Sequence, residues 1–372
     1  MPQELHHKDL EDVIYGATLL GAGGGGSTSI GLSFISQIQK EGKSVVLVSP
    51  DEIKDDALVV VPAILGAPTT RNKHIPALSL IKKYFENVEK RTTDYVVPLE
   101  VGAGNFAVPI HAAAWSNIPL IDGDGAGRSI PSLKLVSFEM HDIPISPMAI
   151  AKTDGNGAIL FVNNTEWAEK ICLQILVAFK GNAGATFYPM TGRQLKDSVI
   201  PGTVSLSMKI GSILRKVREE GAYLPDIFTE ELDAYVLGIG KVKSIEMRSS
   251  KSTSFQKTVV RTERGNLEVY ATYGKVGFET EEGEQETLYT NENIIAKLGE
   301  RILTIAPDLI CWSTTDGKPL TNTDLKEGLD VVVLGFEAHE KLRSEKALTE
   351  FRRIYKEVGF EHLEYTPIEE II

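Results

Sequence analysis

The sequence predicts two domains: an N-terminal α/β domain with a partly parallel sheet, and a C-terminal β-rich domain built as a barrel or a sandwich. Short β-branched runs alternate with helical spacing before about residue 165, whereas polar and apolar side chains alternate between glycine turns over residues 241–290. The first pattern is typical of βαβ units and the second of antiparallel sheets. A length of 372 residues fits two domains, because one domain usually takes roughly 100–200 residues. We expect the domains to cover residues 1–165 and 166–372.

The N-terminal pattern begins with two helices that are joined by a run of glycines. Hydrophobic periodicity then predicts helices over residues 9–20 and 30–40, strands over 44–49 and 57–65, a helix over 75–89, a strand over 94–99, a helix over 105–115 and a strand over 118–121. The last three strands are connected through helices, so right-handed βαβ connections should make them parallel. Their carboxyl ends would then share one edge of the sheet.

The rest of the chain changes from helical to strand-like patterning. A hairpin is predicted around Asp154-Gly155-Asn156-Gly157, followed by a helix over residues 165–180. The β-rich part is predicted to contain strands over residues 258–261, 267–272, 276–279, 309–313 and 331–336, and a helix over residues 342–358.

Composition and charge exclude several classes of partner. Fifty-one acidic and thirty-nine basic residues give a formal net charge of -12, which would repel nucleic acid and anionic membranes alike. We therefore expect a small-molecule substrate, no nucleic acid and no membrane. The two cysteines are too few for a disulfide framework, and the N-terminus lacks an apolar signal core. A cytoplasmic location follows as an expectation.

The glycine run, Gly21–Gly26, formally contains the GxGxxG spacing. Its backbone amides could approach a bound ligand, with Gly24, Gly25, Gly26 and Ser27 as the contacting residues. A nicotinamide site is one alternative, although that fingerprint requires a strand before the glycines and this stretch has helical spacing. A plain turn between two helices is the other alternative.

Charged loops follow the predicted parallel strands. Glu100 ends one strand, and Asp122 and Asp124 follow the next. In open α/β sheets, ligands bind at this edge, and carboxylates can act as general bases or cation ligands. The structural alternative is that the aspartates only cap turns before glycine.

Three polar residues complete the predicted site. The helix start at Asn105 would offer free amides to a ligand. Arg71 and Arg128 lie in loops near the same edge and could hold an anionic group of the substrate.

Several motifs together resemble the S-methyl thiohydantoin desulfurase-like family. They are LGAGGGG at residues 20–26, EVGAGN at 100–105, IPLIDGDGAGR at 118–128, APDLI at 306–310 and DGKPL at 316–320. The resemblance covers most of the chain. It implies an α/β domain followed by a β-rich domain, and association with hydantoinase and oxoprolinase enzymes of cyclic-imide breakdown.

The function expected from these observations is hydrolysis of a thiohydantoin-type or hydantoin-type ring. Asp122 or Asp124 would activate water or bind a divalent metal ion, and Glu100 would act as an acid or a second ligand. A non-catalytic ligand-binding or accessory subunit of a hydantoinase-type enzyme is the competing hypothesis, and a dehydrogenase is the third. The sequence leaves the substrate, the metal and a homo-oligomeric state open.

Overall fold

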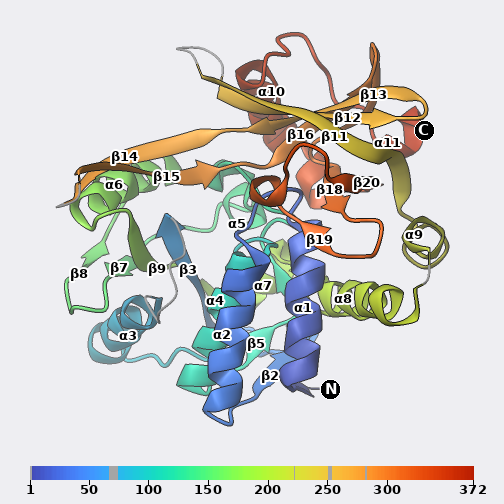
Figure 1. Cartoon of the computed structure of the whole chain (residues 1–372). Coiled ribbons are helices and arrows are strands. Elements are labelled where there is room, and N and C mark those ends of the chain that lie inside the picture. Colours follow the sequence, from blue (N-terminus) through green and yellow to red (C-terminus); the bar gives the residue numbers. More distant parts are fainter. Residues whose placement is uncertain (1, 67–73, 222, 250–253, 281–282) are drawn as a thin grey trace.

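The computed structural model describes residues 2–66, 74–221, 223–249, 254–280 and 283–372, without the side chains of residues 74, 276–280 and 283–289. Figure 1 shows a lower α/β layer that contains the N-terminus and an upper β layer that contains the C-terminus. In the part of the chain that is described, no helix is both long enough and apolar enough to cross a membrane.

The lower layer is built on one eight-stranded mixed sheet, which we call sheet A. Its strands are, in spatial order, β1 (Gln3–Leu5), β2 (Val45–Val48), β5 (Leu120–Ile121), β4 (Tyr95–Val96), β3 (Leu58–Gly66), β9 (Asn182–Thr191), β7 (Met148–Ala151) and β8 (Gly157–Leu160). Strands β2, β5, β4 and β3 are parallel, and the other pairs are antiparallel. The predicted partly parallel sheet and the predicted hairpin are thus confirmed. The strand predicted over residues 94–99 pairs over two residues only.

Helices cover both faces of sheet A. The core on one face contains residues of α1 (His7–Leu20), α2 (Thr28–Lys40), α3 (His74–Tyr84), α4 (Ala103–Ser116) and α8 (Thr203–Glu220). The core on the other face contains residues of α6 (Thr165–Ala178) and extends to α10 (Glu345–Glu357), which lies in the upper layer (Figure 1). Successive strand residues alternate between these two cores, with Val60 in the first and Val59 and Val61 in the second. The helix predicted over 75–89 ends earlier, because residues 85–89 form a π-turn.

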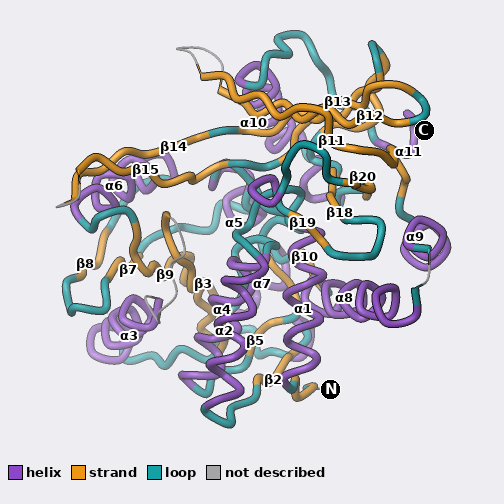
Figure 2. Tube along the Cα trace, in the orientation of Figure 1, coloured by secondary structure: helices purple, strands orange, loops and turns teal. Residues whose placement is uncertain are grey.

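The upper layer is a second sheet, sheet C, in which every pairing is antiparallel. Its spatial order is β17 (Arg301–Ile305), β16 (Asn293–Leu298), β13 (Gly265–Thr272), β12 (Ser254–Thr262), β11 (Tyr235–Ser249), β20 (Asp330–Phe336), β18 (Leu309–Ser313) and β19 (Pro319–Leu320). The sheet curls into a half-barrel (Figure 2), which confirms the predicted β-rich domain. The bulges in the long strand β11 favour this curvature.

The remaining strands and α-helices lie outside the two eight-stranded sheets and the helices named above. They are β6 (Gly123–Asp124) paired with β10 (Ile200–Pro201), the hairpin β14 (Gly274–Thr280) and β15 (Gly283–Thr290), and the helices α5 (Ser137–Met140), α7 (Gly192–Ser198), α9 (Leu224–Leu232) and α11 (Ile368–Ile371). The hairpin extends from the upper layer and contacts α6 (Figure 1).

Two elements that the sequence patterns did not predict complete the lower layer. Strand β9 pairs with both β3 and β7. Helix α8 packs closely on α1, since a Cβ atom at Gly16 would lie 1.8 Å from the carbonyl oxygen of Ser207. Arg215 of α8 also makes two hydrogen bonds, of 3.0 and 2.8 Å, with the carboxylate of Asp12 in α1. The division of the chain at residue 165 stays a prediction.

Candidate functional site

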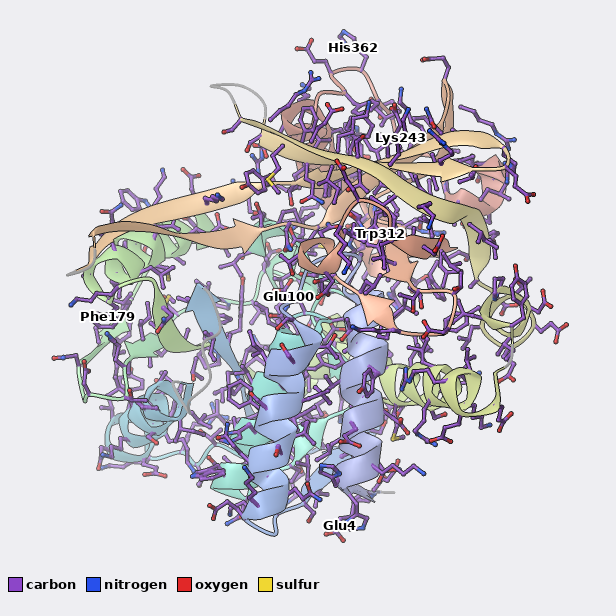
Figure 3. The ribbon with its side chains drawn as sticks, viewed as in Figure 1. Glu4, Glu100, Phe179, Lys243, Trp312 and His362 are labelled. Carbon is purple, nitrogen blue, oxygen red and sulfur yellow. The ribbon has the colours of Figure 1, made fainter. Side chains whose placement is uncertain are left out.

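The candidate site lies where the carboxyl ends of β4 and β5 meet the underside of sheet C. Figure 3 shows Glu100 at the centre of the molecule, between the helices of the lower layer and the strands of the upper layer. Glu100 follows β4 and precedes α4, while Asp122 follows β5 directly. The sheet edge that the sequence predicted as a ligand site therefore faces the other domain.

The glycine run forms a tight turn after α1. Gly23, Gly25 and Gly26 have positive φ angles of 88°, 77° and 84°, which side chains other than glycine rarely adopt. A Cβ atom at Gly24 would lie only 2.6 Å from Oε1 of Glu292. The turn thus needs glycine for its shape and for its close approach to a carboxyl group. Because α1 precedes the turn, the strand that a dinucleotide fingerprint requires is absent from this position.

The start of α4 is closed by the same turn. The carbonyl oxygen of Gly25 accepts hydrogen bonds from the amides of Gly104 at 2.8 Å and Asn105 at 3.3 Å. The expectation that these amides are free for a ligand is therefore wrong. The side chain of Asn105 is half-buried, and its Nδ2 atom would lie 3.4 Å from a Cβ atom at Gly25. Asn105 thus stands beside the glycine turn.

A pair of glutamates shares one serine at this interface. The hydroxyl of Ser129 lies 3.3 Å from Oε2 of Glu100 and 3.1 Å from Oε1 of Glu292. Glu100 Oε2 also accepts a hydrogen bond of 2.7 Å from the amide of Ile130, and Glu292 Oε2 accepts one of 2.9 Å from the hydroxyl of Thr272. Glu100 is half-buried and Glu292 is buried. We call Glu100, Ser129 and Glu292 the carboxyl cluster.

The environment of the carboxyl cluster favours protonated carboxyls. Burial, followed by the charge of Glu292, raises the pKa of Glu100 to about 8, and Asp124 contributes in the same direction. Burial also raises the pKa of Glu292. Glu100 is therefore mainly protonated near neutral pH. Ser129 has a single hydroxyl proton and can donate it to only one of the two carboxyls at a time, whereas a protonated carboxyl can donate to its oxygen.

The two aspartates have different surroundings. Asp124 is fully buried, and its carboxylate accepts hydrogen bonds from the amides of Ala126 and Gly127 at 2.9 Å each. Burial raises the pKa of Asp124 to about 7. Asp122 instead accepts hydrogen bonds from Ser205, at 3.0 Å from the amide and 2.5 Å from the hydroxyl, at the start of α8. Asp124 influences Glu100, whereas Asp122 caps a helix.

Arg128 joins the two domains. It is fully buried, and its guanidinium donates to the carbonyl oxygens of Ser129 at 3.0 Å, Pro307 at 2.9 Å, Asp308 at 3.0 Å and Asn293 at 2.6 Å. Three of these carbonyls belong to the upper layer. We therefore assign Arg128 a role in domain attachment and not in substrate binding.

Of the two other predicted ligand contacts, Ser27 has a role in the fold and Arg71 cannot be placed. Ser27 caps α2 by accepting a hydrogen bond of 3.4 Å from the amide of Ile30. Arg71 lies outside the described residues. Within the described ranges, no group of three or more His, Cys, Asp or Glu side chains is arranged to hold a metal ion.

Glu292 is the member of the site that sequence reasoning missed. It sits in the polar stretch Thr290 to Asn293, which enters β16 and is buried throughout except for Asn291. A run of polar residues directly before the apolar strand β16 was the available signal. Nothing in the sequence alone could have shown that this run packs against the glycine turn, because the contact joins residues from opposite ends of the chain.

Comparisons with known proteins identify the relatives of the chain. Residues 8–161 match the family model described as S-Me-THD-like, N-terminal domain, and residues 163–368 match S-Me-THD-like, C-terminal domain. A crystal structure of a protein from Chromobacterium violaceum is similar with a TM-score of 0.80 and 24% identity, over 98% of this chain and 100% of that one. This likeness shows the shared fold. No curated protein matches the chain.

Proposed function

Because the chain belongs to the S-Me-THD-like family over both of its domains, we propose that it hydrolyses a thiohydantoin-type ring. Its substrate would be a small cyclic compound in which a ring carbon carries a methylthio group and forms a double bond to a ring nitrogen. Water would replace the methylthio group, so that the products are a hydantoin-type ring and a thiol.

Glu100 is the residue that we propose for proton transfer. Its neutral carboxyl gives a proton to the ring nitrogen, which makes the adjacent carbon more electrophilic. The carboxylate that results accepts a proton from the attacking water, and the carbon–oxygen bond forms. That proton then passes to sulfur as the carbon–sulfur bond breaks. The carboxylate of Glu100 then removes the remaining proton of the added hydroxyl as the carbon–oxygen double bond of the product forms. The ring nitrogen keeps the proton that came from Glu100, the thiol takes one proton of the water, and the other water proton restores the neutral Glu100.

One observation carries this proposal: Glu100 is the half-buried carboxyl of the cluster, and its pKa is raised to about 8. A general acid works best when its pKa lies near the working pH. Buried Glu292 supports this state through its charge, and Asn105 lies beside the glycine turn, where its amide could bind the ring. Asp124 is too deeply buried to touch a substrate and acts on the pKa of Glu100 instead.

The direct test is the Glu100→Gln variant with an S-methylthiohydantoin as substrate. Gln keeps the shape of the side chain and can still accept the amide of Ile130, but it cannot transfer a proton. We expect kcat to fall by about a hundredfold or more, which is the usual effect of losing a general acid or base. Glu41→Gln, a change of the same kind at an exposed position after α2, is the control. Equal kcat values in both variants would rule out Glu100 as the proton donor.

A non-catalytic role is the alternative, as a ligand-binding or accessory subunit of a hydantoinase-type enzyme. The buried state of Glu292 and Asp124 favours it, because neither carboxyl is open to a substrate. Ligands that bind only the folded state raise its melting temperature. A rise with thiohydantoins, together with no release of thiol, would support the accessory role.

We also propose a cytoplasmic location. It is supported by the two cysteines, Cys172 and Cys311, which are both buried and unpaired, as is usual for proteins of reducing compartments. A homo-oligomer is compatible with the proposed function but is not required by it.

A further inference from the structure

The hydroxyl of Ser129 has two competing acceptors, and the function proposed above gives it no role. It lies 3.3 Å from Oε2 of Glu100 and 3.1 Å from Oε1 of Glu292. A serine hydroxyl carries one proton, so it can donate to only one of these carboxyls at a time. Ser129 is buried, so this donor acts in a medium where a hydrogen bond to a charge is strong.

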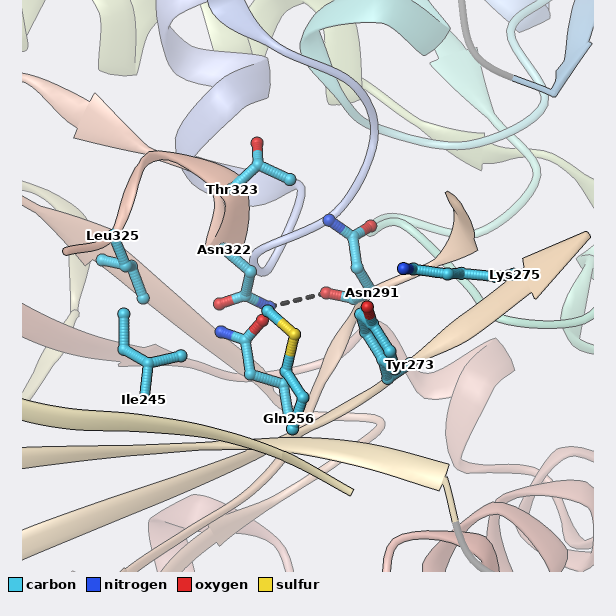
Figure 4. A pocket seen from close by; sticks show the side chains of 9 residues that line it. Ile245, Gln256, Tyr273, Lys275, Asn291, Asn322, Thr323 and Leu325 are labelled. Atoms are coloured by element: carbon cyan, nitrogen blue, oxygen red, sulfur yellow. Dashed lines mark hydrogen bonds between the residues drawn. The ribbon is translucent and has the colours of Figure 1, made fainter. Parts of the chain in front are cut away.

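Glu292 is held in place by its neighbours. Its Oε2 atom accepts hydrogen bonds from the hydroxyl of Thr272 at 2.9 Å and from the amide of Asn291 at 3.0 Å. The carbonyl oxygen of Asn291 accepts one of 2.6 Å from the side-chain amide of Asn322, drawn as a dashed line in Figure 4. Oε1 is therefore the atom of Glu292 that faces Ser129.

The glycine turn leaves space around this hydroxyl. A Cβ atom at Gly24 would lie 2.9 Å from Oγ of Ser129 and 2.6 Å from Oε1 of Glu292. A larger residue at this position would therefore press on both atoms. Glu100 is also held in place, because its Oε2 atom accepts the amide of Ile130 at 2.7 Å. The part of the cluster that can turn most easily is the hydroxyl hydrogen of Ser129.

The charges around the cluster distinguish the two carboxyls. Burial raises the pKa of both, and the charge of Glu292 adds to this effect at Glu100. Asp124 also raises the pKa of Glu100, whereas the charge of Arg128 opposes the rise at Glu292. When the pair holds one proton, these charges favour the proton on Glu100 and the negative charge on Glu292.

Resting on the proposed function, we propose that Ser129 is a positioning residue that turns its hydroxyl from Glu292 to Glu100 when Glu100 gives up its proton. While Glu100 is neutral, the hydroxyl donates to the negative Glu292. When Glu100 becomes a carboxylate in the reaction, the hydroxyl donates to its Oε2 atom, and Glu292 keeps Thr272 and Asn291 as donors. The proton stays on Ser129 and only its direction changes. Because hydrogen bonds to charged groups are the stronger ones, the carboxylate of Glu100 is stabilised as it forms.

The test measures the ionisation of Glu100 through melting temperatures, which need no turnover. The gain in melting temperature that Glu100→Gln causes should grow with pH and level off at the pKa of Glu100 in the folded protein. We call this point the plateau pH, and it lies at about 8 in the unaltered protein. Ser129→Ala removes a donor to the carboxylate and should raise the plateau pH by about half a pH value. Ser129→Cys, which introduces a weaker donor, should shift it in the same direction.

The decisive comparison repeats Ser129→Ala together with Glu292→Gln. Because Thr272 and Asn291 donate to Oε2 of Glu292, the amide oxygen should take that place and the amide nitrogen should face Ser129. The hydroxyl then accepts from this nitrogen and donates to Glu100 alone. Glu292→Gln should therefore lower the plateau pH, and Ser129→Ala in this background should raise it by about one pH value or more. Equal shifts in the two backgrounds would overturn the proposal.

Ser132→Ala is the matched control, because the hydroxyl of Ser132 lies 3.3 Å from a different carboxyl, that of Glu169. It should leave the plateau pH of Glu100 unaltered. In turnover of an S-methylthiohydantoin, Ser129→Ala should lower kcat by about tenfold, as for the loss of a hydrogen bond to a charged group. KM should change little, because the hydroxyl acts on the carboxylate of Glu100 and not on the bound ring.

The two kinds of measurement separate this proposal from the proposed function. Turnover by the unaltered protein, with equal shifts of the plateau pH in both backgrounds, would overturn the role of Ser129 and leave the proposed function standing. Unequal shifts in a protein without turnover would overturn the proposed function and leave the turning hydroxyl. An unchanged kcat in Ser129→Ala would overturn the part of Ser129 in the reaction.

Discussion

At the scale of single residues, the cluster shows how a buried site sets proton affinity. Glu100 and Glu292 approach one hydroxyl, that of Ser129, from opposite domains. Water is displaced by protein on most sides, and the two like charges oppose each other, so the neutral form of Glu100 is favoured. The sequence predicted that acidic residues meet at this edge. It did not predict the partner, because Glu292 arrives from a strand of the other domain.

A change in stability with pH follows from the raised pKa of Glu100. The unfolded chain loses this proton near pH 4.5, whereas the folded protein holds it to about pH 8. The unfolded state therefore binds fewer protons between these values, and the stability of the folded state falls as the pH rises through this window. Glu100→Gln removes that loss. We expect its melting temperature, relative to the unaltered protein, to increase steadily from pH 5 to pH 8.

Glu41→Gln is the control for this experiment, and its melting temperature should follow that of the unaltered protein at every pH. A Glu100→Gln curve that runs parallel to that of the unaltered protein would mean that Glu100 ionises normally in the folded state.

The raised pKa of Glu100 also predicts how the activity falls at alkaline pH. If Glu100 acts as an acid, turnover should decline as the pH rises through about 8.

At the scale of helices and strands, hydrophobic periodicity predicted those elements whose apolar pattern is visible within the element itself. The helices on both sides of the glycine run and the three parallel strands were predicted from periodicity and confirmed. Strand β9 and helix α8 were missed. Each obtains its place from partners far away in sequence, β9 from β3 and β7 and α8 from α1. Tertiary contacts of this kind leave little trace in a single sequence.

Asp122 is another residue whose role depends on a partner far away in sequence, at the start of α8. An aspartate before glycine at a strand end could act in catalysis or could cap backbone amides, and the structure has it bonded to the amide and hydroxyl of Ser205. Asp122→Ala should lower the free energy of unfolding by about 1 kcal/mol, the usual effect of losing a helix cap. Asp122→Asn should remain close to the unaltered protein, because asparagine also caps helices well.

Urea denaturation measures both effects, and kcat for an S-methylthiohydantoin separates capping from catalysis. We expect both Asp122 variants to keep most of the turnover that Glu100→Gln loses. A hundredfold fall in kcat for Asp122→Asn, with unchanged stability, would instead place Asp122 among the catalytic residues.

At the scale of the whole molecule, the two layers share one hydrophobic core. The core on the second face of sheet A contains Val59 and Val61 of that sheet together with Ile294 and Ile305 of sheet C. The domains are therefore packed on each other through buried side chains, and the carboxyl cluster lies at the same interface. This arrangement explains why the sequence pointed to Glu100 and not to Glu292. The motifs of the N-terminal domain identify the residues on one side of the carboxyl cluster. The residues on the other side depend on how the C-terminal domain packs against it.

Arg128 provides the sharpest test of that docking. Its buried guanidinium donates to four carbonyl oxygens, three of them in the upper layer. Arg128→Met would leave these buried carbonyls without a donor, and each unsatisfied group costs roughly 1–3 kcal/mol. We expect a loss of stability on the order of 3 kcal/mol or more and two separate unfolding transitions in urea, as the domains lose their connection. Arg128→Lys keeps the charge but cannot reproduce the planar set of donors. Its stability should therefore lie between that of the unaltered protein and that of Arg128→Met.

Arg301→Met is the matched control, because Arg301 is exposed and donates to a carbonyl near the C-terminus, that of Ile371. Its loss should cost less than about 1 kcal/mol, as for an exposed polar contact. The Arg128 variants should also weaken ligand binding at the carboxyl cluster, because Asn293, which accepts from Arg128, directly follows Glu292 in the chain. A single, unshifted unfolding transition in Arg128→Met would show that the shared apolar core holds the domains together without this side chain.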